Sequence, residues 1–251
     1  MRLVLAHGFT QTARSWDVVT PALRSQLTPD SGEDLEIVAV DLPGHGTAGD
    51  VRRELWGCAD HLIEVGGGDA LYIGYSMGGR VALHAALAHP TAVRGLVLIG
   101  ATPGIDDESA RFQRRAADRE LADRLERIGV SAFLDEWLAL PLFAGLSTSA
   151  AMRSDRLRNR AADLASSLRL TGTGSQSPLW GRLADITAPT LVVVGAADEK
   201  FAAIGERMRA ALPSGEMVSI PNAGHSTHLE QPDATATAIA DWLAGAEFVS
   251  R

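Results

Sequence analysis

The stretch "YIGYSMGGRVAL", residues 72–83, decides the fold of this chain. An apolar run ends in Gly74-Tyr75-Ser76-Met77-Gly78, and a segment of helical character follows it. Gly-x-Ser-x-Gly between a strand and a helix is the nucleophile-elbow pattern. The glycines matter because a tight strand-to-helix turn leaves no room for Cβ atoms beside the serine. The pattern predicts a reactive hydroxyl at Ser76, above the edge of a sheet and at the N-terminus of a helix.

Around this stretch, short apolar runs alternate with longer amphipathic ones. The runs are rich in Val, Leu and Ile at successive positions, which is typical of strands buried on both faces. The candidate strands are residues 2–6, 36–40, 70–75, 95–99, 190–194 and 216–220. The candidate helices are residues 51–65, 77–88, 201–211 and 233–244. The alternation predicts an α/β fold of about six strands, with a mostly parallel sheet and helices on both of its faces.

The alternation breaks once, between Asp106 and Leu183, where no convincing strand is found. We expect residues 106–183 to form a helical cap insertion on a core built from residues 1–105 and 184–251. The insertion should lie over the carboxyl edge of the sheet, where open α/β sheets bind their ligands.

The first part of this insertion, residues 106–127, is intensely charged, with seven acidic residues and six arginines. Pairs four residues apart, such as Glu120–Arg124 and Asp123–Arg127, predict a solvated helix for most of these charges.

Composition narrows the class of protein further. The chain has 251 residues and a formal net charge of −8, which argues against nucleic acid or an anionic membrane as its main partner. A single cysteine excludes an internal disulfide and favours a reducing compartment. The first apolar run is too short for a signal peptide or a membrane span, so a cytoplasmic protein is expected. The seven histidines lack the clustered spacing of a zinc site, so no metal is expected.

A reactive serine needs a base, and the base needs a carboxylate that orients it. In the fold that the elbow implies, the acid precedes the histidine in the chain. Asp198 follows the strand at 190–194 and His225 follows the strand at 216–220, so both stand at carboxyl ends of strands, as Ser76 does. Glu199 is the alternative acid and His228 the alternative base, and both rank lower.

Two backbone N–H groups are expected to form an oxyanion site. One belongs to Met77, directly after the serine, and the other most simply to Phe9, in the loop after the first strand. His7 is expected to make a buried structural hydrogen bond rather than to transfer protons. Asp41 and His45, in "VDLPGHG", are expected to shape a turn.

Arg80 raises a separate question, because it lies one helical turn past Ser76 on the same face of its helix. A buried arginine is costly unless it is paired. Either an internal carboxylate pairs with Arg80, or Arg80 points into a pocket and receives an anionic substrate. From the residues alone, the two alternatives carry equal weight.

These motifs resemble the α/β-hydrolase superfamily over nearly the whole chain, with the family's first two strands missing. Together, "HGF…W", "VDLPGHG", "GYSMGGRVAL", "RFQRRAADRELADRLE", "FLDEWLALPLF", "PLW" and "VGAADEKF…AGHSTHLEQP" are similar to the 2-succinyl-6-hydroxy-2,4-cyclohexadiene-1-carboxylate synthases of menaquinone biosynthesis. Among these motifs, "DEKF" and "GGR" best distinguish this synthase family from the rest of the superfamily.

The resemblance implies a carbon–oxygen lyase that removes a proton from a small substrate with several carboxylates and eliminates pyruvate. It implies that Ser76, activated by His225 and Asp198, acts as a base, while Phe9 and Met77 stabilise charge on a substrate carboxylate oxygen. It implies no cofactor and no metal. The implied substrate-binding residues are Arg80 and Arg114, which clamp carboxylates, and Tyr75, Trp137, Phe143 and Lys200, which line the pocket.

The sequence departs from this family at one notable place, since the loop "HGFTQTARSW" lacks the glycine that relatives more often have near Gln11. The departure leaves room for a serine carboxylesterase or another α/β-fold hydrolase of a small, possibly anionic ester. A non-catalytic binding protein of the same fold is a weaker alternative, because such a protein has no use for a complete triad. The sequence leaves the oligomeric state open.

Overall fold

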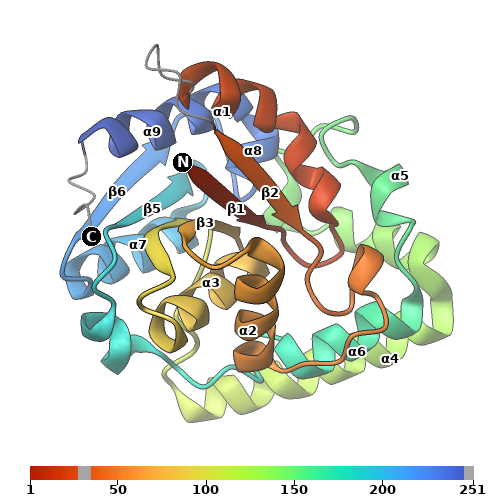
Figure 1. Cartoon of the computed structure of the whole chain (residues 1–251). Coiled ribbons are helices and arrows are strands. Elements are labelled where there is room, and N and C mark those ends of the chain that lie inside the picture. Colours follow the sequence, from red (N-terminus) through yellow and green to blue (C-terminus); the bar gives the residue numbers. More distant parts are fainter. Residues whose placement is uncertain (28–34, 246–251) are drawn as a thin grey trace.

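The computed structural model describes residues 1–27 and 35–245. Within that part of the chain, six parallel strands form one sheet in the order β2-β1-β3-β4-β5-β6 (Figure 1). The strands are β1 (Arg2–Ala6), β2 (Glu36–Val40), β3 (Ala70–Tyr75), β4 (Val93–Ile99), β5 (Thr190–Gly195) and β6 (Gly215–Ile220). The predicted strands are confirmed, with small differences at the ends of β4, β5 and β6. The predicted α/β-hydrolase fold is therefore correct.

Helices cover both faces of the sheet (Figure 1). One face carries α2 (Leu55–Gly66), α3 (Met77–Ala88) and α7 (Glu199–Ala211). The other carries α1 (Thr20–Leu27) and α9 (Pro232–Gly245), with the one-turn helix α8 (Thr227–Glu230) before α9. The helix at residues 20–27 was not predicted, and α2 begins four residues later than expected, where Glu54 caps it by accepting from Trp56 and Gly57.

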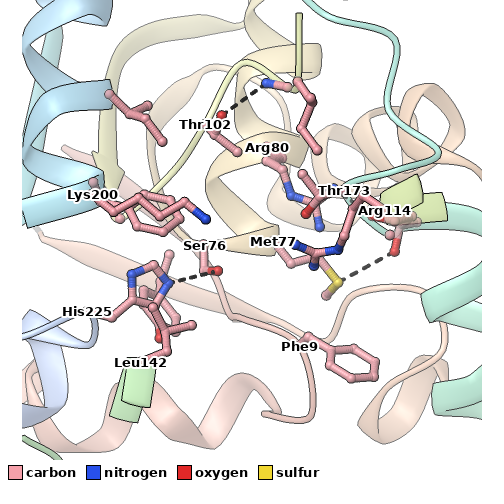
Figure 2. Close-up of a pocket in the computed structure, with 18 of the residues that line it drawn as sticks. Phe9, Ser76, Met77, Arg80, Thr102, Arg114, Leu142, Thr173, Lys200 and His225 are labelled. Atoms are coloured by element: carbon pink, nitrogen blue, oxygen red, sulfur yellow. Dashed lines mark hydrogen bonds between the residues drawn. The ribbon is translucent and has the colours of Figure 1, made fainter. Parts of the chain in front are cut away.

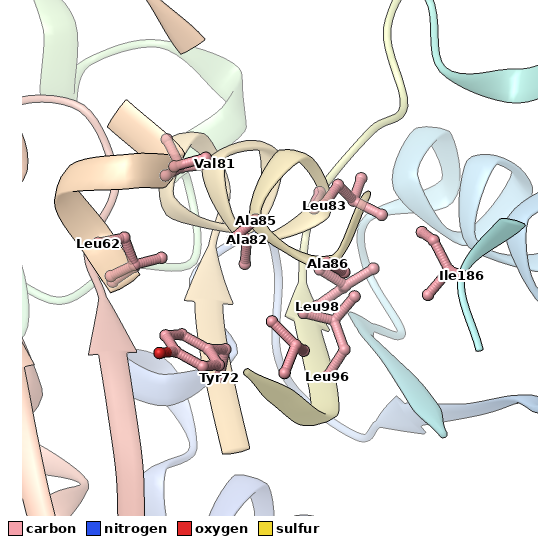
Figure 3. Packing of buried hydrophobic residues seen from close by; sticks show 14 of the residues in the cluster. Leu62, Tyr72, Val81, Ala82, Leu83, Ala85, Ala86, Leu96, Leu98 and Ile186 are labelled. Atoms are coloured by element: carbon pink, nitrogen blue, oxygen red, sulfur yellow. The ribbon is translucent and has the colours of Figure 1, made fainter. Parts of the chain in front are cut away.

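The alternating side chains of β1 show how each strand serves two cores. Val4 and Ala6 pack with α2 and α3, whereas Leu3 and Leu5 pack with α1 and α9. All four are essentially inaccessible to solvent. The first of these cores is drawn in Figure 3, where Leu62 of α2 and the alanines of α3 lie over Tyr72 of β3. The continuous apolar runs in the sequence are thus explained, because strands covered on both faces have no solvent side.

The segment between β4 and β5 holds helices and no strand among its described residues. These are α4 (Glu108–Leu138), α5 (Arg153–Arg156) and α6 (Ala161–Thr171), together with the short 3₁₀ helices η3 (Pro141–Phe143) and η4 (Trp180–Asp185). Two further 3₁₀ turns, η1 (Ala13–Val18) and η2 (Gly46–Ala48), lie in loops of the core. Helix α4 is kinked at Gly129, whose φ is 76°, and it packs on α6 through a small apolar core of its own. A long helical insertion is therefore present, and its limits at residues 106 and 183 stay a prediction.

The predicted charge pairs Glu120–Arg124 and Asp123–Arg127 are wrong, because Arg124 and Asp123 have other partners. Arg124 Nε donates to Glu136 at 2.7 Å, and Asp123 accepts from Arg169 of α6 at 2.6 Å. These pairs join α4 across its kink and to α6, because helix packing brings closer partners than the next turn of the same helix. No helix in the described residues is long and apolar enough to cross a membrane.

The strand order determines where the topological switch point of the sheet lies. The chain adds β2 on one side of β1 and then crosses to add β3 on the other side, so β1 and β3 flank the topological switch point. At their carboxyl ends Ala6 pairs with Gly74, which sets the loop after β1 directly beside the turn after β3. Open α/β sheets bind ligands at such a point.

Gly78 is where this arrangement is tightest, and a methyl group there should destabilise the protein. A Cβ atom on Gly78 would lie 2.1 Å from the Ala6 carbonyl oxygen, a backbone atom that cannot swing away. We expect Gly78→Ala to lower the free energy of unfolding by at least about 1–3 kcal/mol, as overpacking does. Chemical denaturation of the variant and the parent protein measures this change in the free energy of unfolding.

Gly181→Ala is the matched control, because a Cβ atom there would meet no heavy atom within 4 Å. It should leave the free energy of unfolding within about 0.5 kcal/mol of the parent value. Equal effects of the two substitutions would contradict the packing argument.

Candidate active site

Ser76 stands in the turn between β3 and α3, with φ 50° and ψ −105°. Its N–H donates to the Ile99 carbonyl at 2.8 Å, which ties the turn to β4. A Cβ atom on Gly74 would lie 2.5 Å from the Gly78 backbone, and one on Gly79 would lie 2.6 Å from the Ala101 side chain. The glycines around the serine are thus required by close approach of the chain, as the sequence pattern predicts.

The three side chains of the expected relay lie together at this edge. Ser76 Oγ is 3.3 Å from His225 Nε2 (Figure 2). On the other side of the ring, His225 Nδ1 is 2.8 Å from Asp198 Oδ2. Asp198 also accepts the Phe201 N–H at 3.2 Å and so caps α7, which holds its carboxylate in place. The order serine–histidine–aspartate gives the imidazole one neighbour that supplies a proton and one that orients the ring.

The lower-ranked candidates occupy other places. Glu199 is exposed at the first position of α7. His228 is fully buried, with its ring centroid 4.7 Å from that of Trp16 and 4.4 Å from that of Tyr75. Burial lowers the pKa of His228 to about 3, so the ring is neutral at physiological pH. Neither residue is hydrogen-bonded to His225 or to Ser76 in the described part of the chain.

The two expected oxyanion donors, Phe9 and Met77, both line the cavity at Ser76. Among the described residues, neither N–H donates to a protein acceptor, so both are available to a ligand. Gly8 lets the loop pass close, because a Cβ atom there would lie 2.6 Å from the Tyr75 ring. The cavity is thus lined by two residues with unused backbone donors, the kind of group that stabilises an anionic oxygen.

His7 and His45 have structural roles, as predicted. His7 Nδ1–H donates to the Gly8 carbonyl at 2.8 Å, and its Nε2 accepts the Leu42 N–H at 3.0 Å. His45 Nε2 accepts the Thr10 N–H at 3.2 Å. Burial lowers the pKa of both rings, that of His45 to about 3, so both are neutral and keep these partners.

Asp41 shapes a turn, as was expected from the sequence "VDLPGHG". Its carboxylate accepts the N–H of Ala13 at 2.7 Å and that of Thr47 at 2.8 Å, and these bonds lower its pKa against the opposing effect of burial.

A cavity of about 370 Å³ opens over Ser76, with walls from both the core and the insertion. All the pocket residues expected from the sequence line it, namely Tyr75, Arg80, Arg114, Trp137, Phe143 and Lys200. Two more cations, Arg156 and Arg207, also line it, while Asp106 is the one acidic side chain among the lining residues described. The cavity is therefore strongly cationic in a protein of formal net charge −8.

Arg80 is buried in the wall and has no carboxylate partner. Its Nη1 donates to the Thr171 carbonyl at 2.6 Å and contacts Gln176 Oε1 at 3.5 Å, and no carboxylate of the described residues reaches ion-pair distance. Burial, with a contribution from nearby Arg114, lowers its pKa to about 10, so the guanidinium stays charged at neutral pH. Of the two alternatives for Arg80, the internal carboxylate is excluded for these residues.

Arg114, on α4, reaches the same part of the cavity (Figure 2). Its Nε donates to Asp118 Oδ1 at 2.7 Å, and Asp118 is itself held by the Gly174 N–H at 3.0 Å. The other guanidinium nitrogens make no protein hydrogen bond in the described chain. Its neighbour Arg115 instead lies over the exposed ring of Phe112, at 5.9 Å from the ring centroid. Arg114, and not Arg115, is thus the arginine of this helix that faces the cavity.

Sequence reasoning missed Arg156. Its side chain is almost wholly buried and donates to the Ala151 carbonyl at 2.8 Å and to Thr10 Oγ1. Burial lowers its pKa to about 10, which leaves it charged. No periodicity marks it, because it lies on the four-residue helix α5 in an irregular segment. Only the fold brings it to Phe9.

The comparisons with known proteins agree with this geometry. The model of the alpha/beta hydrolase family matches residues 3–238. The chain belongs to the alpha/beta hydrolase family. Within the part described, this alpha/beta hydrolase has no group of three or more His, Cys, Asp or Glu side chains placed to hold a metal ion.

Relatives narrow the family further. The chain is 32% identical to the 2-succinyl-6-hydroxy-2,4-cyclohexadiene-1-carboxylate synthase of Enterobacter sp. (strain 638), covering 96% of this chain and 91% of that protein. It is 35% identical to a Bacillus subtilis (strain 168) protein that carries the same name provisionally, covering 96% and 89%. The solved structure of MenH from S. aureus superposes with a TM-score of 0.87 at 31% identity, covering 98% of this chain and 94% of that one.

The neighbouring carboxylates Asp198 and Glu199 allow a sharp test of the relay. Asp198→Asn should slow labelling of Ser76 by a nitrophenyl phosphonate by about 10³–10⁴-fold, because the amide disturbs the tautomer and orientation of His225. Glu199→Gln, at the adjacent exposed position, should leave the labelling rate unchanged. The reverse result would assign the acid to Glu199.

Proposed function

We propose that this protein is a 2-succinyl-6-hydroxy-2,4-cyclohexadiene-1-carboxylate synthase, which eliminates pyruvate from 2-succinyl-5-enolpyruvyl-6-hydroxy-3-cyclohexene-1-carboxylate in menaquinone biosynthesis. The observation that carries the proposal is the charged, buried Arg80 beside Ser76, which has no carboxylate of its own among the described residues. A polyanionic substrate supplies that carboxylate. The full-length similarity to synthases of this name supports the same substrate.

The reaction begins with removal of a proton from carbon 2 of the substrate ring, which lies next to the succinyl ketone. His225 Nε2 takes the Ser76 hydroxyl proton, and Ser76 Oγ takes the ring proton, so serine acts as base. The electron pair moves through the ring double bond, and the bond between carbon 5 and the enolpyruvyl oxygen breaks. Protonation of the departing enolate, with the proton returned through His225, gives pyruvate and the cyclohexadiene. Atoms and charge balance without any co-reactant.

The two backbone donors stabilise the charge that develops in this step. A carbanion at carbon 2 is conjugated with the ketone, so negative charge accumulates on the succinyl keto oxygen and not on the carboxylate oxygen expected from the sequence. The N–H groups of Phe9 and Met77 are free to donate to that oxygen. Fixed dipoles at this point lower the barrier because they need no reorganisation during the reaction.

The cations of the cavity are distributed as three carboxylates require. Arg80 and Arg114 meet on one side of Ser76, and Lys200 reaches toward Ser76 from the opposite side (Figure 2). Arg156 stands beside the oxyanion loop. Between them, the rings of Trp137 and Phe143, with centroids 5.7 Å apart, form an apolar wall for the substrate ring.

The second candidate is a carboxylesterase acting on an anionic ester. It is favoured by the 3.3 Å contact between Ser76 Oγ and His225 Nε2, a geometry that also serves nucleophilic attack. In that reaction Ser76 forms an acyl-enzyme, whereas in the proposed elimination it forms no covalent bond to the substrate. A non-catalytic binding protein makes no use of this contact.

The first measurement is pyruvate release from the precursor generated in situ, with the spontaneous elimination subtracted. Wild-type protein should accelerate release, and Ser76→Ala should abolish the acceleration. No acceleration by the wild type, together with turnover of p-nitrophenyl esters, would replace the proposal with the esterase.

The adjacent arginines of α4 test the carboxylate clamp. Arg114→Ala should cost about 1–3 kcal/mol in kcat/KM for the same reaction, as loss of a charged hydrogen bond does. Arg115→Ala is the matched control and should leave kcat/KM unchanged, because Arg115 lies over Phe112 outside the cavity. Arg80→Ala should cost a similar amount to Arg114→Ala, and a variant of Arg80 with unchanged kinetics would refute the clamp.

A further inference from the structure

The oxyanion loop is built on a strained turn whose critical residue is Thr10. Residues 8–11 form a β-turn closed by the Gln11 N–H, which donates to the Gly8 carbonyl at 3.2 Å. Thr10 is the third residue of the turn and has φ 69°, in the left-handed region. A turn of this kind favours glycine at that position. A buried, β-branched residue adopts such a backbone only where its surroundings hold it there.

The turn fixes the direction of the Phe9 N–H. In a trans peptide, the N–H of Phe9 points opposite to the Gly8 carbonyl. That carbonyl is held from two sides, by His7 Nδ1–H at 2.8 Å and by the Gln11 N–H. The Gly8 N–H in turn donates to Gln11 Oε1 at 2.9 Å. While the turn stays closed, the Phe9 N–H therefore points away from these partners, at a residue that lines the cavity.

Every polar group of Thr10 is bound, and two of its three partners come from the insertion. Its N–H donates to His45 of the core at 3.2 Å. Its carbonyl accepts from Asn159 Nδ2 at 2.8 Å, and its Oγ1 accepts from Arg156 Nη1. Asn159 is itself fixed by the Gly46 N–H, which donates to its Oδ1 at 2.8 Å. The strain at Thr10 is thus held by one side chain of α5, Arg156, and one that follows it, Asn159.

We infer that Thr10 is a positioning residue, which aims the Phe9 N–H at the reacting oxygen only while the segment from α5 to Asn159 is docked on it. Gln11 is part of the same device, because its side-chain Oε1 accepts the Gly8 N–H and its own N–H closes the turn. The insertion therefore completes the oxyanion site as well as forming a wall of the pocket. The inference rests on the proposed use of the Phe9 N–H as an oxyanion donor.

Thr10→Val tests this, since it keeps the size and branching of the side chain and removes the hydroxyl that Arg156 holds. We expect kcat for pyruvate release, and the rate at which a nitrophenyl phosphonate labels Ser76, to fall at least about tenfold, a fraction of the loss from deleting an oxyanion donor. KM should stay within about twofold, because Thr10 is not among the residues that line the cavity. Thr10→Ser keeps the hydroxyl and should restore both rates to within about twofold.

Thr12→Val is the matched control. Thr12 also contacts the insertion, through a 2.6 Å hydrogen bond to Asp155, but it lies outside the turn. Thr12→Val should leave both rates unchanged, because the Thr12–Asp155 bond does not act on the turn that directs the Phe9 N–H. If Thr10→Val does not fold, Asn159→Leu removes the bond to the Thr10 carbonyl and should slow labelling in the same way.

Unchanged rates in Thr10→Val, or an equal loss in Thr12→Val, would overturn the inference. Labelling by the phosphonate tests the role of Thr10 independently of the proposed function, because it does not require pyruvate release. If the wild type is labelled but releases no pyruvate, and Thr10→Val is labelled at least tenfold more slowly, the synthase proposal fails and the inference stands. A wild type that is neither labelled nor active would refute both.

Discussion

The end of β1 and the first turn of α3 approach so closely that a single methyl group cannot fit between them. Gly78 lies against the Ala6 carbonyl, and Gly74 lies against Gly78 and Gly79. This contact forces the sharp turn at Ser76, and it sets the loop after β1 beside the serine. The donors at Phe9 and Met77 can therefore converge on one side of the hydroxyl. The position of Ser76 and of the loop beside it follows from this approach.

A second constraint is the cost of burying positive charge. Arg80 and Arg156 both lose hydration in the wall of the cavity, which lowers the pKa of each to about 10 without discharging it. Neutral carbonyls and a hydroxyl satisfy some of their donors, but they supply no negative charge. In the proposed function, the carboxylates of the substrate offset this free energy of desolvation. The same proposal predicts strong discrimination against neutral substrates, because a neutral ligand leaves the buried cations unpaired.

The insertion and the core are also tied together at the outer end of the cavity. Arg207 of α7 lies over the Trp180 ring, 3.6 Å from its centroid, and donates to Asp106 at 2.5 Å. Trp180 Nε1 donates to the Gly104 carbonyl at 2.9 Å, so both ends of the insertion are joined near the same point. Together with the contacts at Thr10, these bonds hold the helical segment between β4 and β5 to the core at two places. The site is a product of two parts of the chain rather than of the core alone.

The sequence was sufficient for the sheet, the elbow and the three residues of the relay, because each depends on local signals: continuous apolar runs, glycines around one serine, and polar residues directly after strands. The spacing from Ser76 marked Arg80, and the family resemblance favoured its role in a pocket and added Arg114. No local signal in the sequence predicted which charged side chains contact which partners. Arg124 pairs with Glu136 and not with Glu120, and Arg156, on an irregular segment, reaches Thr10 from 146 positions away. Such contacts depend on how α4, α5 and α6 pack over the sheet, and packing is decided by the whole core. Only the folded chain therefore shows that Arg156 and Asn159 hold the loop after β1.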